Sequence, residues 1–286
     1  MKTLVSFSGG RTSAMMSKML LDQRKEDDEL MFVFANTGEE DERTLEFVNR
    51  CDKEWGLGVV WVEAEVTQKN RVATTHRIVT FETATRGPIL FERMIEKYGI
   101  PNKNYPHCTR ELKQRPIHSY AKLATNGQPY RTAIGIRADE IDRVNPAFEK
   151  LGLYYPLCDA KIRKADVFAF WDKQSFDLQV PEHRGNCVWC WKKSLRKHLT
   201  LARETPQIFK FAMRMEEKHA YSGAGVGPRR FFREKKTARE LIELSREPFE
   251  TFIDQRHLDQ GGGCEESCEV HDGQEEMSAL WEEAAE

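Results

Sequence analysis

The sequence predicts an α/β protein with a doubly wound, mostly parallel sheet, followed by a C-terminal helical region. Through the first half of the chain, short apolar runs alternate with segments whose apolar residues recur at helical spacing. Near residue 185 this alternation ends, and a helical, basic pattern with Gly/Pro interruptions begins. We therefore expect a sheet-containing domain over residues 1–184 and a cysteine-containing helical region over residues 185–286.

The expected strands are short and mostly apolar, as is typical of strands buried on both faces of a parallel sheet. They cover residues 3–8, 31–35, 59–62 and 130–136. Residues 67–87 contain basic side chains among many threonines and have no clear period. We interpret this stretch as an irregular insertion near a site, or as a solvated loop.

Helical spacing predicts a helix after each of the first strands and a longer helical region at the end. The expected helices cover residues 13–21, 40–55, 88–98, 110–124 and, with interruptions, 191–245. Lysine and arginine crowd the last of these regions. Either the basic residues form a solvated face balanced by acidic residues, which we favour, or they contact nucleic acid, in which case affinity would fall steeply with salt.

Composition narrows the class of protein further. The formal net charge is −2, so the chain as a whole does not indicate nucleic-acid or membrane binding. No apolar stretch approaches the roughly 20 residues that span a bilayer, and the N-terminus does not resemble a signal peptide. We therefore expect a cytoplasmic protein. Its seven cysteines then indicate free thiols or metal ligands rather than a disulfide framework.

A glycine turn joins the first strand to the first helix. Gly9 and Gly10 would expose successive backbone N–H groups at a helix N-terminus, and the hydroxyls of Ser8, Thr12 and Ser13 would complete an anion-binding cradle. The alternative is an ordinary turn in which Thr12 or Ser13 caps the helix. If the cradle interpretation holds, Gly9→Val should remove nucleotide binding by blocking backbone approach while the sheet stays folded.

This stretch, SFSGGRTSA, resembles the pyrophosphate-binding loop of the adenine nucleotide α-hydrolase superfamily, whose usual form is S-G-G-x-D-S. Three further stretches resemble the phosphoadenosine phosphosulfate (PAPS) reductase branch of that superfamily. They are FANTGE at residues 34–39, GIRADE at residues 135–140 with Arg143 after it, and YPL at residues 155–157 followed by ADV at residues 165–167. The resemblance implies the adenine nucleotide α-hydrolase fold.

The resemblance also implies roles for single residues. The residues that would hold nucleotide phosphate or sulfate are Ser8, Gly9, Gly10, Arg11, Thr12 and Ser13. Asn36 and Thr37 would lie beside the ribose or adenine, and Gly135 would lie near the anion. Arg137 and Arg143 would act as catalytic residues facing an anionic group, with Glu140 orienting one of them. The alternative for these arginines is a surface ion pair, which stabilises little.

The cysteines suggest a metal site. Cys187 and Cys190 form a C-x-x-C pair, which fits a redox dithiol, half of a zinc site or part of an iron–sulfur cluster. Cys108 and this pair each precede an expected basic helix, a position that favours thiolate. Because several PAPS reductase relatives carry a [4Fe-4S] cluster, the resemblance implies one here, with zinc as the alternative. The implied ligands are Cys108, Cys187, Cys190 and Cys264, with Cys268 or Cys158 as alternatives for the fourth; Cys51 is expected in the core.

Three functions remain open. In a sulfonucleotide reductase, Cys268 of the C-terminal C-x-x-H stretch would be the nucleophile, and a thioredoxin-like protein would donate electrons. In an ATP-dependent sulfur transferase, an adenylated nucleic acid or other acceptor would receive sulfur. Thr12 in place of the loop Asp favours the reductase, whereas the altered tail motif disfavours it. The third function is nucleotide or nucleic-acid binding with a structural metal. A homodimer is compatible with each, and no membrane partner is expected.

Overall fold

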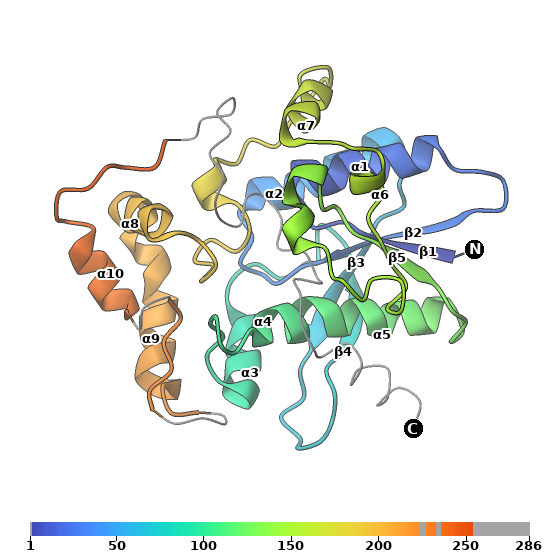
Figure 1. The fold of residues 1–286 in the computed structure, drawn as a ribbon. Coiled ribbons are helices and arrows are strands. Elements are labelled where there is room, and N and C mark those ends of the chain that lie inside the picture. The colour runs from blue at the N-terminus through green and yellow to red at the C-terminus, as the bar shows by residue number, and fades with distance from the viewer. Residues whose placement is uncertain (1, 223–226, 233–235, 254–286) are drawn as a thin grey trace.

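The computed structural model describes residues 2–222, 227–232 and 236–253, which form a six-stranded sheet covered by helices (Figure 1). The strand order is β4-β3-β2-β1-β5-β6, and every neighbouring pair is parallel except β3 and β4. The strands are β1 (Lys2–Ser6), β2 (Glu29–Ala35), β3 (Val60–Glu65), β4 (Thr75–Val79), β5 (Arg131–Ala133) and β6 (Leu153–Tyr154). The expected α/β fold with a mostly parallel, doubly wound sheet is confirmed.

Two strands differ from expectation. Strand β4 lies within residues 67–87, which we interpreted as irregular, and it pairs antiparallel with β3 at the edge of the sheet. Its five residues are polar or exposed at most positions, so it lacks the apolar run of a buried strand. Strand β6 has only two residues, too few to leave a period in the sequence.

Helices cover both faces of the sheet. On one face, α1 (Arg11–Asp22), α2 (Glu42–Trp55) and α7 (Lys164–Trp171) pack on a core that includes Phe34 and Trp61. On the other, α5 (Arg115–Ala124) packs on Leu4 and Val33. Figure 1 shows these two layers above and below the strands, with the short helix α6 (Pro156–Asp159) on the side of α1. Because successive strand residues face opposite sides, alternate residues of β1 and β2 serve the two cores.

The expected helix over residues 110–124 is interrupted. It consists of α4 (His107–Thr109), a π-helical turn η1 (Arg110–Gln114) and then α5. Such π-helical turns occur frequently at functional sites. Short 3₁₀ turns also occur in the described residues, namely η2 (Ala138–Arg143), η3 (Glu182–Arg184) and η4 (Pro206–Ile208).

The C-terminal helices share a core with the sheet-containing region. Helices α8 (Leu195–Glu204), α9 (Phe209–His219) and α10 (Ala238–Leu244) gather beside α3 (Ile89–Tyr98) (Figure 1). Phe91 and Met94 of α3 belong to the same buried cluster as Trp189 and Phe209. The proposed division at residue 185 stays a prediction, and the apolar contact across it is continuous.

Candidate functional site

The turn between β1 and α1 requires glycine at its first glycine position. Gly9 has φ +85°, a backbone conformation that glycine adopts readily. A Cβ atom there would lie 2.8 Å from Cγ2 of Thr44 and 3.1 Å from Cε2 of Phe34. The expectation that Gly9→Val leaves the sheet folded stays a prediction, but the new side chain would press on Thr44 and Phe34 of the core as well as block a ligand.

The side chain of Ser13 shapes this turn. Its hydroxyl accepts hydrogen bonds from the backbone N–H (3.2 Å) and the hydroxyl (2.9 Å) of Ser8, and donates to the carbonyl of Gly10 (3.1 Å). The N-cap of α1 is Gly10, so the alternative in which Thr12 or Ser13 caps the helix is wrong. Among the described residues, the backbone N–H groups of Gly9 and Gly10 have no hydrogen-bond partner. Two donors at a helix N-terminus are thereby left for an anion.

Arg11 follows the two glycines, and the structure gives its guanidinium a protein partner. It forms hydrogen bonds of 2.6 and 2.9 Å to the carboxylate of Asp177 and another to the carbonyl of Leu178, and it is nearly fully buried. In addition, Trp171 donates to the backbone carbonyl of Arg11. The side chain that we predicted to bind phosphate therefore fastens the segment at residue 177 to the turn.

Arg137 lies beside the glycine turn, although 125 residues separate it from Thr12. It follows β5, is almost fully buried, and its Nη1 lies 3.3 Å from the Thr12 hydroxyl. Glu140 lies 3.5 Å from the Arg137 guanidinium and also pairs with Arg143. The structure thus brings the first and third stretches of the family resemblance together. Arg143 contacts the opposite oxygen of the Glu140 carboxylate, so Glu140 bridges Arg137 and Arg143.

Asn36 holds the turn after β2 in place. Its side chain, fully buried, donates to Glu63 (2.6 Å) and to the carbonyl of Thr85 (2.9 Å), and it accepts from the N–H of Gly38. The neighbouring Thr37 donates its hydroxyl to Glu40, and the same hydroxyl lies 3.4 Å from the sulfur of Cys187. Asn36 is therefore a structural residue in this arrangement, whereas Thr37 contacts the cysteine pair.

Sequence reasoning missed the carboxylate of Glu63, which lies in β3 with no exposed surface. Arg77 and the backbone and hydroxyl of Thr85 also donate to it. Burial by itself would raise the pKa of Glu63, but the hydrogen bonds from Thr85, Arg77 and Asn36 outweigh it and lower the pKa. Its signal was an acidic residue between the apolar residues Val62 and Ala64 of β3. The Glu63 carboxylate ties β4 and the following loop to Asn36.

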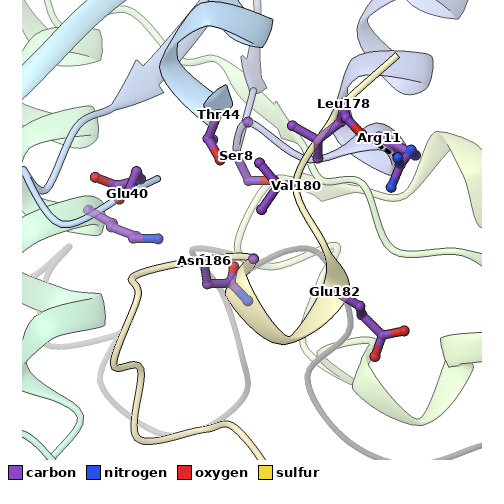
Figure 2. A pocket seen from close by; sticks show the side chains of 11 residues that line it. Ser8, Arg11, Glu40, Thr44, Leu178, Val180, Glu182 and Asn186 are labelled. Carbon is purple, nitrogen blue, oxygen red and sulfur yellow. Dashed lines mark hydrogen bonds between the residues drawn. The ribbon is translucent and has the colours of Figure 1, made fainter. Parts of the chain in front are cut away.

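A cavity opens between the glycine turn and a segment far along the chain (Figure 2). The empty space between its walls is about 420 Å³, a figure that includes the part open to solvent. The lining residues are Ser8, Gly9, Arg11, Glu40, Thr44, Lys113, Leu178, Val180, Glu182, Gly185 and Asn186. Sequence reasoning anticipated the turn but not the wall over residues 178–186, which no local pattern connects with residue 8.

The cysteine loop, residues 186–190, lies beside the segment that follows β2. Val188 donates its N–H to the carbonyl of Glu39, and Cys187 forms an isolated bridge with Glu40. Cys187 and Cys190 are both buried, and the next helix, α8, begins only at Leu195. The C-x-x-C pair therefore lies in turns before a helix, not at its first residues.

The thiol of Cys187 differs electrostatically from what we expected. Burial raises its pKa well above the ordinary value, and the nearby Glu40 raises it further, while Lys113 and the Thr37 hydroxyl lower it less. The prediction that its position favours thiolate is wrong for the protein without a metal, because desolvation outweighs the basic neighbours.

Three of the four implied metal ligands lie in one part of the fold. Cys108, Cys187 and Cys190 belong to the same apolar cluster, and Nε1 of Trp191 lies 3.4 Å from the Cys108 sulfur. Across the described ranges, no group of three His, Cys, Asp or Glu side chains is arranged to hold a metal ion. The described residues by themselves therefore do not form a cluster site. Cys264 and Cys268 lie outside the described residues.

The other two cysteines have structural surroundings. The Cys158 thiol donates to the carbonyls of Ile136 and Arg137, packs with a different apolar cluster, and has its pKa raised to about 11, chiefly by burial. Its role as an alternative fourth ligand gains no support from this position. Cys51 is buried in the core between the sheet and α2, as expected.

Four basic residues of the C-terminal helices form ion pairs with acidic residues. The pairs are Arg196–Glu250, Lys197–Glu182, Arg214–Glu92 and Arg239–Glu217. This arrangement agrees with the interpretation of a solvated face balanced by acidic residues. In the part of the chain that the structure describes, no helix has both the length and the apolar character needed to cross a bilayer.

Comparison with known proteins assigns the chain to a family. The model of the phosphoadenosine phosphosulfate reductase domain matches residues 2–145, which contain the glycine turn and Arg137. The uncharacterized nin region protein ORF290 of Escherichia phage lambda is 31% identical over 284 residues, which cover 96% of this chain and 97% of that protein. The uncharacterized protein MJ0973 of Methanocaldococcus jannaschii is 29% identical over 186 residues, which cover 65% of this chain and 34% of that protein. The chain therefore belongs to the phosphoadenosine phosphosulfate reductase domain family, a family related to nucleotides whose members are generally enzymes.

Proposed function

We propose that this protein is an enzyme that binds an adenine nucleotide on the glycine turn and carries out sulfur chemistry on it, with PAPS as the first candidate substrate. One observation carries the proposal. The N–H groups of Gly9 and Gly10, which find no partner within the described residues, belong to a turn that lines a cavity, and the residue before Cys187 lines the same cavity. An anion-binding turn and the first residue of the cysteine loop, which line one cavity, suit a sulfonated nucleotide.

The phosphate end of the nucleotide would accept hydrogen bonds from Gly9 and Gly10. Helix α1 has twelve residues and no acidic side chain in its first turn, so its dipole favours an anion there. Lys113 lines the cavity while nearly buried, and its charge would stabilise negative oxygens more than it would in water. Arg137 would support the turn through Thr12 and add positive charge beside it.

In the proposed reaction, the thiolate of Cys268 attacks the sulfur of the sulfuryl group. An S–S bond forms, the S–O bond to the nucleotide breaks, and adenosine bisphosphate leaves with the electron pair. A dithiol donor of the thioredoxin kind then attacks the Cys268 sulfur, releases sulfite and is oxidised to a disulfide.

The place where the described chain ends supports this role for the tail. Phe252 packs on His183, directly beside Glu182 of the cavity wall. Cys268 lies fifteen positions after Ile253, a length of chain that reaches up to about 50 Å when extended. Cys268 is therefore within reach of the cavity.

We also propose that a [4Fe-4S] cluster is held by Cys108, Cys187, Cys190 and Cys264, with zinc as the alternative metal. The presence of the first three cysteines in one apolar cluster supports this, although the described residues alone are not arranged as a metal site, and Cys264 lies outside them. When bound, such a cluster would supply a redox-active group near the cavity. None of the proposed reaction steps depends on it.

One observation favours a second candidate, the ATP-dependent sulfur transferase. The carboxylate of Glu40 lines the cavity beside the glycine turn (Figure 2). Carboxylates next to nucleotide phosphates are common ligands of Mg²⁺, which ATP cleavage requires and sulfonucleotide reduction does not. A nucleic acid or another molecule would then be the sulfur acceptor.

The two candidates are separated by binding and turnover measurements on protein purified without oxygen. We would measure iron and sulfide content, titrate PAPS and ATP with and without Mg²⁺, and assay sulfite release with a dithiol donor. The first candidate predicts tight PAPS binding without Mg²⁺ and sulfite release that is lost in Cys268→Ser. Binding of ATP only with Mg²⁺, and no sulfite, would favour the second. Binding of neither nucleotide would refute both.

A further inference from the structure

Asn186, the residue before Cys187, has an unusual backbone conformation. Its φ is +59°, which places it in the left-handed region. Asparagine is one of the few non-glycine residues that adopt this region with some frequency. Residues held in such conformations cluster at ligand-binding sites and switch regions. The position therefore calls for an explanation beyond chain geometry.

The backbone around Asn186 is fastened on both sides. The ammonium of Lys193 donates to the carbonyls of Gly185 and Cys187, and the N–H of Val188 donates to the carbonyl of Glu39. Because both neighbours of Asn186 are held, its left-handed conformation is imposed by the loop. Glycine would satisfy that conformation at least as well, so the backbone alone gives no reason for a side chain here.

The side chain of Asn186 lines the cavity. Figure 2 shows it on the side formed by the cysteine loop, with Ser8 on the side formed by the glycine turn. Among the residues that the structure describes, none forms a hydrogen bond with its amide group. Two N–H donors and one carbonyl acceptor are thus available to whatever occupies the cavity.

We propose that Asn186 donates a hydrogen bond to a phosphate or sulfate oxygen of the nucleotide bound on the glycine turn. The inference rests on the proposed nucleotide site and names a contact within it. The other polar groups of the cavity include the carboxylates of Glu40 and Glu182, which repel an anion, whereas a neutral amide can turn its donors toward one. Through Asn186 the bound nucleotide contacts the same loop that carries Cys187 and Cys190.

Two substitutions separate this role from a purely conformational one. Asn186→Gly keeps the left-handed backbone and removes the amide. Asn186→Asp keeps the shape and the tolerance for positive φ but replaces the donor by a negative carboxylate. The matched control is Asn126→Gly, because Asn126 also has a positive φ (+52°) but is exposed after α5 and does not line the cavity.

The measurement is calorimetric titration of each protein with PAPS and with ATP, together with thermal unfolding. For the nucleotide that the wild type binds, we expect about tenfold weaker binding in Asn186→Gly, the usual effect of losing one hydrogen bond to a charged group. In Asn186→Asp the loss should exceed about tenfold, because a carboxylate would face the anion. Asn126→Gly should bind like the wild type.

The outcomes distinguish the inference from the proposed function. Wild-type affinity in Asn186→Gly or in Asn186→Asp would overturn the role of Asn186 and leave the nucleotide site intact. If the wild type binds neither nucleotide, the proposed function fails and the inference fails with it. Should Asn186→Gly not fold, Asn186→Asp decides alone, since it introduces no change in shape.

Discussion

The glycine turn and the cysteine loop line one cavity but are stabilised in different ways. The turn is held mainly by neighbours in sequence, since Ser13 binds Ser8 and Gly10 within a span of six residues. The cysteine loop is held by partners from distant parts of the chain, including the carbonyl of Glu39 and the aromatic rings around Trp189. Local contacts leave a short motif that can be identified in a sequence, whereas long-range contacts leave none.

The largest expected effect tests the cysteine loop. Trp189 is 1% exposed, and its ring lies 4.6 Å from that of Phe91 and 5.0 Å from that of Phe231, centroid to centroid. Trp189→Ala should lower the free energy of unfolding by about 4 kcal/mol, because it empties the centre of the aromatic cluster. Urea denaturation measures this loss. Trp189→Phe, which retains much of the packing, should lose clearly less; an equal loss would show that the ring volume is not what holds the loop.

A smaller effect is expected in the glycine turn. Gly9→Ala combines a positive φ with a Cβ placed 2.8 Å from Thr44, and should destabilise the protein by about 3 kcal/mol. The control is Gly58→Ala, which also has a positive φ (+68°) but meets no atom within 4 Å, and should lose about 1 kcal/mol. Denaturant unfolding of the two variants and the wild type measures both losses in the free energy of unfolding. Equal losses would mean that the contact with Thr44 relaxes without cost.

The smallest effect concerns the contact between the cysteine loop and the segment after β2. Burial raises the pKa of Glu39 to about 7, partly opposed by the hydrogen bond that Trp189 donates to it. Because the folded-state pKa lies above the unfolded value, Glu39 stabilises the fold below about pH 4.5, and this contribution is lost as the pH rises toward 7.

Replacing Glu39 by glutamine tests that pH dependence. The amide introduced by Glu39→Gln cannot ionise but keeps an acceptor for Trp189. The variant should therefore flatten the fall in stability between pH 4.5 and 7, by on the order of 1 kcal/mol. Thermal unfolding over that pH range measures it. Glu216, whose pKa burial also raises to about 7, should keep the remaining slope in the variant. An unchanged pH profile would show that Glu39 stays ionised in the folded protein.

Much of the fold could be predicted because its determinants are periodic and local. Four strands of the parallel part of the sheet were visible as apolar runs, and α2 and α3 as amphipathic helices. The strand β4 could not be predicted, since its mixed polar residues pair at the edge of the sheet, where burial imposes no pattern. Likewise, the ionisation state of Cys187 was misjudged, because neighbours in sequence do not reveal how deeply a thiol is buried.

The candidate site likewise contains residues that short motifs identify and residues that only contacts between distant segments identify. Ser8, Gly9 and Arg137 belong to short motifs, and the structure brings these motifs together. Asn186 and Glu63 were not singled out, because the first depends on a cavity wall from a distant segment and the second on hydrogen bonds from β4 and its loop. Arg11 was assigned to a ligand, yet its guanidinium pairs with Asp177, which lies 166 residues away.

The sequence alone determined the α/β sheet, the glycine turn and the family, because each depends on the spacing of residues within a few turns of chain. Only the tertiary structure decided which side chains face the cavity, which are occupied by protein partners, and which thiols are buried. Those properties arise from contacts between segments far apart in the chain. The free energy of those contacts depends on desolvation and packing where the segments meet. No single stretch of sequence contains that information.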